Sequence, residues 1–477
     1  MQPTEHILHN FQLVSSIPRG TKYEAGIRQW LEGWAAANRC ASRVDAAGNL
    51  VVRVPASAGR ASDATVILQG HLDMVWQKTP ESTHDFTRDP IRLIRDGDWI
   101  HADSVTLGAD NGAALALMMA LAEDEHISHP ALELLFTVEE EVGLTGARQL
   151  DPTMISGKTL INLDSEEEGV LIVGCAGGGG VTITLPVAWS AQTKNEVCFE
   201  ILVGGLKGGH SGVDIHKQRA NSNKLMARVL DALQRDAPIR LAALKGGTAR
   251  NAIPREAQAV FFCPREKIAR CRAAFAEIVD VIRGERQYAE PALTVTMSEK
   301  KDSAQAIGAV ETQAAIRLLT ALPCGVLKMS EDASGIVETS SNIGVVELKE
   351  DGLLIASNHR SCVSARIEEE VRRVESLAGL AGATAERTGL GAPWQPNMDS
   401  PLLKKCAAAY RSLNGKAPKV EIIHAGLECG VISERCGGLD CISLGPTIEN
   451  PHSPDERLYV PSLAETWNLL EAVLQQP

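Results

Sequence analysis

Short apolar runs bounded by turn residues alternate with helix-type segments over about the first 180 residues. The segment NGAALALMMALAEDE (111–125) is typical of a helix. The strand-type runs are NLVVRV (49–54), ATVILQG (64–70), LELLFTV (132–138), TLINLD (159–164) and GVLIVG (169–174). This alternation predicts an α/β domain in which helices cover the faces of a sheet.

The pattern changes from about residue 186. A strand, a helix, a strand, a helix and a strand follow, in an order that resembles a ferredoxin-like, split βαβ unit. They are VCFEILVGG (197–205), SNKLMARVLDALQR (222–235), AQAVFFC (257–263), EKIARCRAAFAEIVDVIRGE (266–285) and ALTVTMSE (292–299). A second helix, strand, strand, helix series runs from AIRLLTAL (315–322) to RIEEEVRRVESLAGL (366–380). We therefore hypothesise that this region consists of two related halves, although we find no residue-level repeat.

A Pro-rich segment, GAPWQPNMDSPL (391–402), precedes a return of the α/β alternation. We therefore predict a first domain formed by residues 1–185 and 391–477, interrupted by an inserted α+β, ferredoxin-like domain over residues 186–390. The tract CAGGGG (175–180) lacks the Lys and Ser/Thr of a phosphate-binding loop. We interpret this tract as a flexible turn at a strand end.

Composition narrows the possible partners. The chain has 47 basic and 60 acidic residues, a formal net charge of −13 and a pI near 5.5. Such acidity argues against nucleic-acid and anionic-membrane partners and leaves carboxylates available to hold cations. We find neither a run of about 20 apolar residues nor a secretory signal. The eleven cysteines are scattered and form no C-x-x-C pair, which indicates reduced thiols in a cytoplasmic protein.

Acidic and histidine side chains follow several of the predicted strands. His71 and Asp73 come directly after an apolar run, and side chains two apart in an extended segment share a face. Further residues of this kind are Asp110, Glu139 to Glu141, Asp164 and His452. For Asp110, which precedes a helix, an N-cap role is an equal alternative. Strand-end groups converge in one crevice of an open α/β sheet, where unpaired carboxylates repel one another. We infer two divalent cations, which this mixture of imidazole and carboxylate suits.

Seven segments together resemble one family. They are HLDMVW, TLGADNG, EEVGLTGA, LINLDSEEEG, GGHSGVDIHKQRAN, IHAGLECGV and GPTIENPHSPDE. In this order they are similar to the aminoacyl-histidine (Xaa-His, cytosol non-specific) dipeptidases, which are related to carnosinases, aminoacylases and glutamate-type carboxypeptidases within the di-zinc peptidases. The resemblance implies a zinc-peptidase-like catalytic domain with a central mixed sheet, interrupted by an inserted lid or dimerisation domain.

The resemblance also implies a set of metal ligands. Asp110 would bridge two metal ions and would be followed by a cis peptide bond. His71 and Asp164 would complete one site, and Glu141 and His452 would complete the other. Zinc is the implied metal, and the same ligand set would also accept cobalt or manganese.

Two acids and one histidine have implied roles in the reaction. Asp73 matches the acid that orients a ligand imidazole. Glu140 matches the general base, which would take a proton from a metal-bridging water as it attacks the peptide carbonyl. Glu139 is the extra acid of this run. If the match to the family segment were shifted by one residue, the base and the ligand would be assigned to the wrong acids. His210 matches the donor to the developing oxyanion, either within its own chain or across a dimer.

Three more residues match family segments that face the substrate, namely Asn221, Arg360 and Glu428. Arg360 could clamp a C-terminal carboxylate, and Glu428 could meet a free α-ammonium. The sequence therefore predicts a cytoplasmic, metal-dependent dipeptidase that cleaves Xaa-His dipeptides such as β-alanyl-histidine, with a homodimer as the family expectation. The alternatives are an N-acyl amino acid hydrolase or a carboxypeptidase with the same metals, and a catalytically silent metal-binding scaffold.

Overall fold

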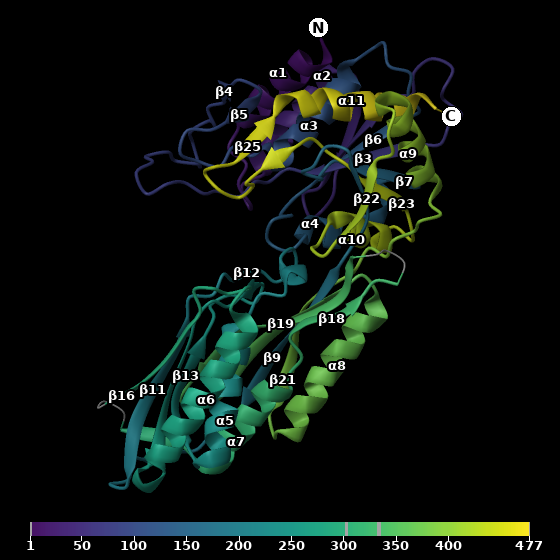
Figure 1. Ribbon diagram of the computed structural model, residues 1–477. Helices are drawn as coiled ribbons and strands as arrows, with labels where there is room; N and C mark the ends of the chain where they lie inside the picture. The colour runs from purple at the N-terminus through teal and green to yellow at the C-terminus, as the bar shows by residue number, and fades with distance from the viewer. Residues whose placement is uncertain (1, 301–303, 332–334, 477) are drawn as a thin grey trace. The chain divides into compact units, whose positions relative to one another are not determined.

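The computed structural model describes residues 2–300, 304–331 and 335–476 (Figure 1). The chain divides into two compact units. Unit 1 consists of Met1–Cys175, Trp394–Ile423 and Leu427–Pro477, and unit 2 consists of Ala176–Pro393 and His424–Gly426. Among the described helices, none combines the length and the hydropathy that a bilayer span requires.

Unit 1 is built on a mixed sheet with eight described strands, in the order β1-β2-β6-β3-β7-β23-β8-β22. The strands β6, β3, β7 and β23 are parallel to one another at its centre. The bounds are β1 (Ala41–Val44), β2 (Leu50–Val54), β3 (Val66–His71), β6 (Leu132–Thr137), β7 (Thr159–Asn162), β8 (Val170–Cys175), β22 (Lys419–Ile423) and β23 (Asp440–Ser443). The predicted α/β class with a central mixed sheet is confirmed.

The helix α3 (Ala109–Glu123) is buried from Ala109 to Leu121, because its sequence is apolar on every side. Its position agrees with the helix predicted over 111–125. The other helices of unit 1 are α1 (Pro3–Ser15), α2 (Ala25–Ala37), α4 (Thr145–Gln149), α9 (Pro401–Asn414), α10 (Glu428–Arg435) and α11 (Val460–Gln475). A smaller sheet joins β4 (Ile94–Asp96), β5 (Trp99–His101), β24 (Ile448–Glu449) and β25 (Arg457–Tyr459).

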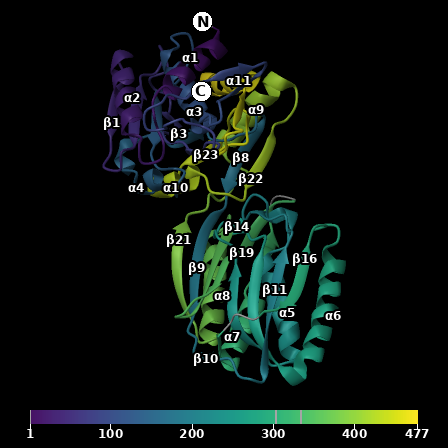
Figure 2. The ribbon, with the colours of Figure 1, turned by 90° about the vertical axis from the view of Figure 1, so that its left-hand side faces the viewer.

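Unit 2 contains an antiparallel sheet in the order β16-β11-β15-β13-β19-β20-β9-β21, with β18 paired to β19. Its strands are β9 (Gly177–Leu185), β11 (Glu196–Gly204), β13 (Arg240–Gly246), β15 (Ala257–Pro264), β16 (Thr294–Glu299), β18 (Gly325–Met329), β19 (Val337–Leu348), β20 (Leu353–Ser361) and β21 (Thr384–Gly391). Alternate residues of these strands share one core with α5 (Ser222–Asp236), α6 (Ile268–Arg286), α7 (Ala309–Ala321) and α8 (Ser364–Leu380). Figure 2 shows these four helices beside the sheet. Two short pairs complete the unit: β10 (Trp189–Ala191) with β17 (Gln305–Ile307), and β12 (Gly209–His210) with β14 (Ala252–Ile253).

The large sheet of unit 2 consists of two ferredoxin-like halves. The first half runs β11-α5-β13-β15-α6-β16, and its strands lie in the order β16-β11-β15-β13. The second half consists of β9, α7, β19, β20, α8 and β21, and its strands lie in the corresponding order β21-β9-β20-β19. The first half is therefore inserted after the first strand of the second. The sequence suggested two halves but missed β13 and assigned no strand to β9.

The interpretation of CAGGGG as a turn is wrong, because Gly177–Gly180 begin strand β9. This strand pairs with β20 on one side and with β21 on the other, so unit 2 begins at Ala176 rather than at residue 186. Close contact with neighbouring backbone explains why residue 177 is a glycine. A Cβ at Gly177 would lie 2.3 Å from the carbonyl oxygen of Gly391 and 2.5 Å from the nitrogen of Pro393.

We predict that Gly177→Ala lowers the free energy of unfolding by about 1–3 kcal/mol, because the added methyl group would meet backbone that cannot rotate away. Gly178→Ala is the matched control in the same strand. A Cβ at Gly178 would have its nearest neighbours at 3.8 Å, which is ordinary contact. Urea denaturation of both variants measures the difference, and equal midpoints for Gly177→Ala and Gly178→Ala would contradict the close-approach explanation.

Candidate metal centre

The strand-end residues of unit 1 converge because β3, β6 and β7 are parallel and in register. His71 pairs with Thr137 at the ends of β3 and β6, and Gln69 pairs with Asn162 in β7. The carboxyl ends of these strands therefore lie at one edge of the sheet. The segments that follow carry Asp73, Glu139 to Glu141 and Asp164 to the same edge.

Asp110 enters the centre from the start of α3. The preceding Gly108 has φ 69°, a left-handed conformation that favours glycine. The peptide bond between Asp110 and Asn111 is cis, as the resemblance implied. The Asn111 side chain accepts a hydrogen bond from the His71 amide at 3.2 Å and donates to the Leu163 carbonyl at 3.1 Å. The α3 start is thereby joined to both neighbouring strand ends.

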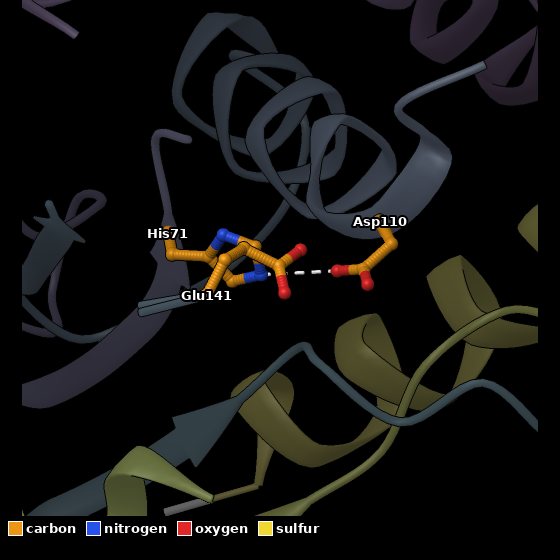
Figure 3. A group of neighbouring side chains, drawn as sticks. All are labelled: His71, Asp110 and Glu141. Atoms are coloured by element: carbon orange, nitrogen blue, oxygen red, sulfur yellow. Dashed lines mark hydrogen bonds and ion pairs between the residues drawn. The ribbon is translucent and has the colours of Figure 1, made fainter. Parts of the chain in front are cut away.

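Two histidines contact Asp110 from opposite sides. His71 Nε2 lies 3.0 Å from Asp110 Oδ1 and 3.3 Å from Asp164 Oδ1. His452 Nε2 lies 2.9 Å from Asp110 Oδ2 and 3.0 Å from Glu141 Oε2. Figure 3 shows His71, Asp110 and Glu141, which offer ligand atoms that all lie within 4.8 Å of one another. The two oxygens of one carboxylate thus face two separate imidazole–carboxylate pairs.

This donor set fits two divalent metal ions. Two ligands of a tetrahedral zinc ion are about 3.3 Å apart, since each lies about 2.0–2.1 Å from the metal. The four imidazole–carboxylate contacts, two at Asp110, one at Asp164 and one at Glu141, are 2.9–3.3 Å long and so are close to that spacing. Glu141 Oε1 is buried and has no hydrogen-bond partner in the described structure, so it is free to act as a ligand atom. The side chains of Asp110 and Asp164 are 10% exposed and that of Glu141 is 6% exposed.

The shifted pKa values of its side chains indicate how strongly this cluster attracts positive charge. Burial raises the pKa of Asp164 to about 6, and it raises the pKa of Glu140 well above its ordinary value. Hydrogen bonds to Asp110 and Glu141 raise the pKa of His452 to about 11. Burial opposes protonation of His71, yet Asp164, Asp110 and Asp73 hold its pKa well above the usual range. Without metal ions, protons supply the compensating charge; divalent cations would replace them.

Asp73 connects a ligand histidine to the acidic segment. Its carbonyl oxygen lies 3.1 Å from His71 Nδ1. Its carboxylate is completely buried and lies 3.4 Å from the same nitrogen, so His71 Nε2 is left to face Asp110 and Asp164. It also accepts hydrogen bonds from the backbone N–H groups of Glu140 at 3.0 Å and Glu141 at 3.3 Å, and from Thr21 Oγ1 at 2.9 Å. One carboxylate therefore orients the imidazole and fixes the backbone of the neighbouring acids.

Glu428, at the start of α10, lies in a buried polar network behind the centre. Its Oε2 accepts hydrogen bonds from Gln69 Nε2 at 2.5 Å and from Thr137 Oγ1 at 2.7 Å. Gln69 in turn accepts one from Asn162 at 2.6 Å. The residue has no exposed surface, Oε1 has no hydrogen-bond partner in the described structure, and burial raises the pKa of the carboxyl to about 7.

Three of the predicted residues, His210, Asn221 and Arg360, belong to unit 2. His210 Nδ1 accepts hydrogen bonds from the backbone N–H groups of Gly212 at 3.3 Å and Val213 at 3.1 Å. The ring proton of the neutral imidazole is therefore on Nε2. Burial and the nearby Arg360 guanidinium lower the pKa of His210, which keeps the ring neutral.

Asn221 is the N-cap of α5, and both ends of its side chain are occupied. Its Oδ1 accepts from the backbone N–H groups of Asn223 and Lys224, and its Nδ2 donates to Asn342 Oδ1 and the Ile343 carbonyl. The helix start accounts for the bonds to Oδ1, whereas the bonds from Nδ2 join α5 to β19.

The sequence interpretation assigned no role to two buried charged residues of this centre, Arg19 and Glu456. Glu456 lies inside the segment GPTIENPHSPDE that was used for the resemblance. Arg19 lies far from every motif in the sequence. Their contacts run from side chain to main chain, which leaves no spacing pattern that would predict them.

Comparison with known proteins identifies similar chains. A model of peptidase family M20/M25/M40 matches residues 67–476. The cytosol non-specific dipeptidase of Escherichia coli (strain K12) is 38% identical over 466 residues, which cover 98% of this chain and 96% of that protein.

Solved structures give a corresponding result. The aminoacylhistidine dipeptidase from Vibrio alginolyticus superposes with a TM-score of 0.91 at 36% identity, covering 98% of this chain and 96% of that chain. Human carnosine dipeptidase 1 superposes with a TM-score of 0.52 at 12% identity, covering 99% and 96%, and this shows a shared fold alone.

Proposed function

This chain belongs to peptidase family M20/M25/M40, and on that premise we propose that it is a metal-dependent dipeptidase of the aminoacylhistidine type. Its substrates are dipeptides of the Xaa-His type, such as β-alanyl-histidine. The observation that carries the proposal is the pair of imidazole–carboxylate contacts on either side of Asp110, with Glu140 next to the ligand Glu141. An unligated acid beside a complete ligand set has no use in a purely structural metal site.

The metal centre would hold two divalent ions, zinc in the first place and cobalt or manganese as alternatives. His71 and Asp164 would hold one ion, His452 and Glu141 would hold the other, and Asp110 would bridge them. When bound, the ions would polarise the scissile carbonyl and lower the pKa of the attacking water.

Glu140 would act as the general base. Among the described residues its carboxylate makes no hydrogen bond, and its backbone is fixed by Asp73. This leaves the side chain free to take a proton from water and to deliver that proton to the leaving amine. Asp73 would act as a positioning residue, since it holds both the His71 ring and the Glu140 backbone.

His210 would donate a hydrogen bond from Nε2 to the carbonyl oxygen as negative charge develops there. The two backbone N–H groups bonded to its Nδ1 support this role, because they select the required tautomer. Arg360 would bind the substrate carboxylate and Glu428 the α-ammonium. Asn221 would contribute to substrate binding indirectly, because its side chain donates a hydrogen bond to Asn342.

We predict that Glu140→Gln lowers kcat for β-alanyl-histidine or another Xaa-His dipeptide by about 10²- to 10⁴-fold, because the amide cannot accept the proton. The bound metal, measured by elemental analysis, should be unchanged, since Glu140 is not a ligand. Glu139→Gln is the matched control in the neighbouring position and should retain activity.

Chelation should abolish the hydrolysis, and added zinc should restore it. A rate untouched by chelator would exclude a metallopeptidase. Loss of activity in Glu139→Gln with retention in Glu140→Gln would shift the assignment of the acids by one position. Cleavage of N-acyl amino acids alone would favour the acylase function over the dipeptidase.

We predict that His210→Ala lowers kcat by about 10²- to 10³-fold with a smaller change in KM, because the missing donor acts mainly in the transition state. His210→Gln should recover part of the loss, since its amide nitrogen can take the place of Nε2. His216→Ala, at an exposed position of the same segment, serves as control. Equal kcat values for the wild type and His210→Ala would rule out the donor role.

We also propose a cytoplasmic homodimer. The eleven cysteines all lie among the described residues and none forms a disulfide bond, which supports a reducing compartment. The homodimer is the expectation of the family. Light scattering should therefore give twice the chain mass of 51.0 kDa, and an active enzyme with the mass of one chain would contradict the dimer.

A further inference from the structure

We propose that Arg19 and Glu456 are positioning residues that hold the peptide segment of Asp110 from two sides and so set the geometry of both metal sites. This inference rests on the proposed metal-binding function of Asp110 and goes beyond it. Neither residue offers a ligand atom in the cluster described above. Their effect is exerted through the main chain of the ligand-bearing segments.

Arg19 connects two of these segments. It lies between α1 and α2, and only 1% of its surface is exposed. Its guanidinium donates to the carbonyl oxygens of Leu72 at 3.1 Å and Asp73 at 2.9 Å, and also to that of Gly108. All three bonds reach main-chain acceptors, so the side chain joins the segment after His71 to the segment before Asp110.

Glu456 holds the second segment from the other direction. It is 1% exposed and lies four positions after His452. Its carboxylate accepts hydrogen bonds from the backbone N–H groups of Gly108 at 2.9 Å and Asp110 at 3.2 Å. The residue Gly108 is thus bound through its N–H to an acid and through its C=O to a guanidinium.

Steric constraints reinforce this arrangement. A Cβ at Gly108 or at Gly112 would lie 2.7 Å from Arg19 Nη2 in each case. The guanidinium therefore occupies the space that two glycines leave beside the start of α3. Because the carboxylate of Asp110 faces both imidazoles, a displacement of its backbone would change the spacing of both ligand pairs at once.

Arg19 and Glu456 are oppositely charged groups that attract each other, and the guanidinium is also attracted by Asp110 and Asp73. Burying either residue alone would leave an uncompensated charge next to the ligands.

The test is metal affinity, measured with Zn²⁺ alone by chelator competition in the absence of substrate. In Glu456→Gln one acceptor oxygen becomes an amide N–H₂ that faces a backbone N–H. We expect a 10- to 100-fold weaker affinity for Zn²⁺, the usual effect of losing a group that orients a ligand. The absorption spectrum of the Co²⁺-loaded protein should shift as well, because the ligand geometry changes.

Glu133→Gln is the matched control. Glu133 is 2% exposed, lies near the start of β6 at the opposite end from the metal centre, and accepts from the backbone N–H groups of Ser156 and Gly157. It should lose thermal stability to a similar extent but keep wild-type Zn²⁺ affinity and Co²⁺ spectrum. If Glu456→Gln and Glu133→Gln bind Zn²⁺ equally well, the positioning role is wrong.

Arg19→Lys keeps the proposal testable if Glu456→Gln fails to fold. Lysine retains the charge but not the planar fork that reaches three carbonyls. We expect weaker Zn²⁺ binding and a lower kcat with little change in KM, and wild-type Zn²⁺ affinity would overturn the inference. A wild-type protein that binds Zn²⁺ but cleaves no dipeptide would refute the proposed function and leave the positioning role standing.

Discussion

Mutual repulsion among buried carboxylates is the constraint on which the centre of unit 1 depends. Asp73, Asp110, Glu140, Glu141 and Asp164 share one edge of the sheet, and burial raises the pKa of Glu140 and Asp164. The fold keeps them together because their backbones are fixed by the parallel strands and by α3. The excess negative charge of these carboxylates has to be compensated by positive charge. The two imidazoles, one at each oxygen of Asp110, mark where that positive charge is needed.

A layer of uncharged polar side chains lies directly behind the ligands. Gln69 and Asn162 each precede a ligand by two residues, and Thr137 ends the strand that leads to the acidic segment. Glu428 joins this layer through Gln69 and Thr137. Because every strand end is tied to its neighbour through side chains, the ligands cannot move independently. Such rigidity is required where ligand spacing has to match a metal ion within a few tenths of an ångström.

The sequence predicted that the candidate ligands lie together, and contacts do join His71 to Asp110 and Asp164 and join His452 to Asp110 and Glu141. His71, the acidic run 139–141 and Asp164 could be found by a short-range rule, because each follows an apolar run and parallel strands end at one edge of a sheet. Asp110, before a helix, and His452, in a Pro-bounded turn, were assigned through the family resemblance. The same reasoning failed for β9, since glycines give no strand signal, and Gly177 is required there by the close approach of Gly391 and Pro393. It also failed for Arg19 and Glu456. Their bonds join residues that are 89 and 348 positions apart in the chain, and a main-chain partner leaves no mark in the sequence.

The topology of unit 2 explains how so large a segment is accommodated within the chain of unit 1. The chain enters unit 2 at β9 and leaves it after β21, and these two strands are paired neighbours. On the side of unit 1, Cys175 pairs with Trp394 through two backbone hydrogen bonds of 3.0 Å. An insertion whose ends are adjacent does not require the host sheet to open. The second ferredoxin-like half provides both adjacent strands, whereas the first half, inserted after β9, contributes neither. The doubling of unit 2 therefore leaves unchanged the mixed sheet that carries the candidate metal ligands.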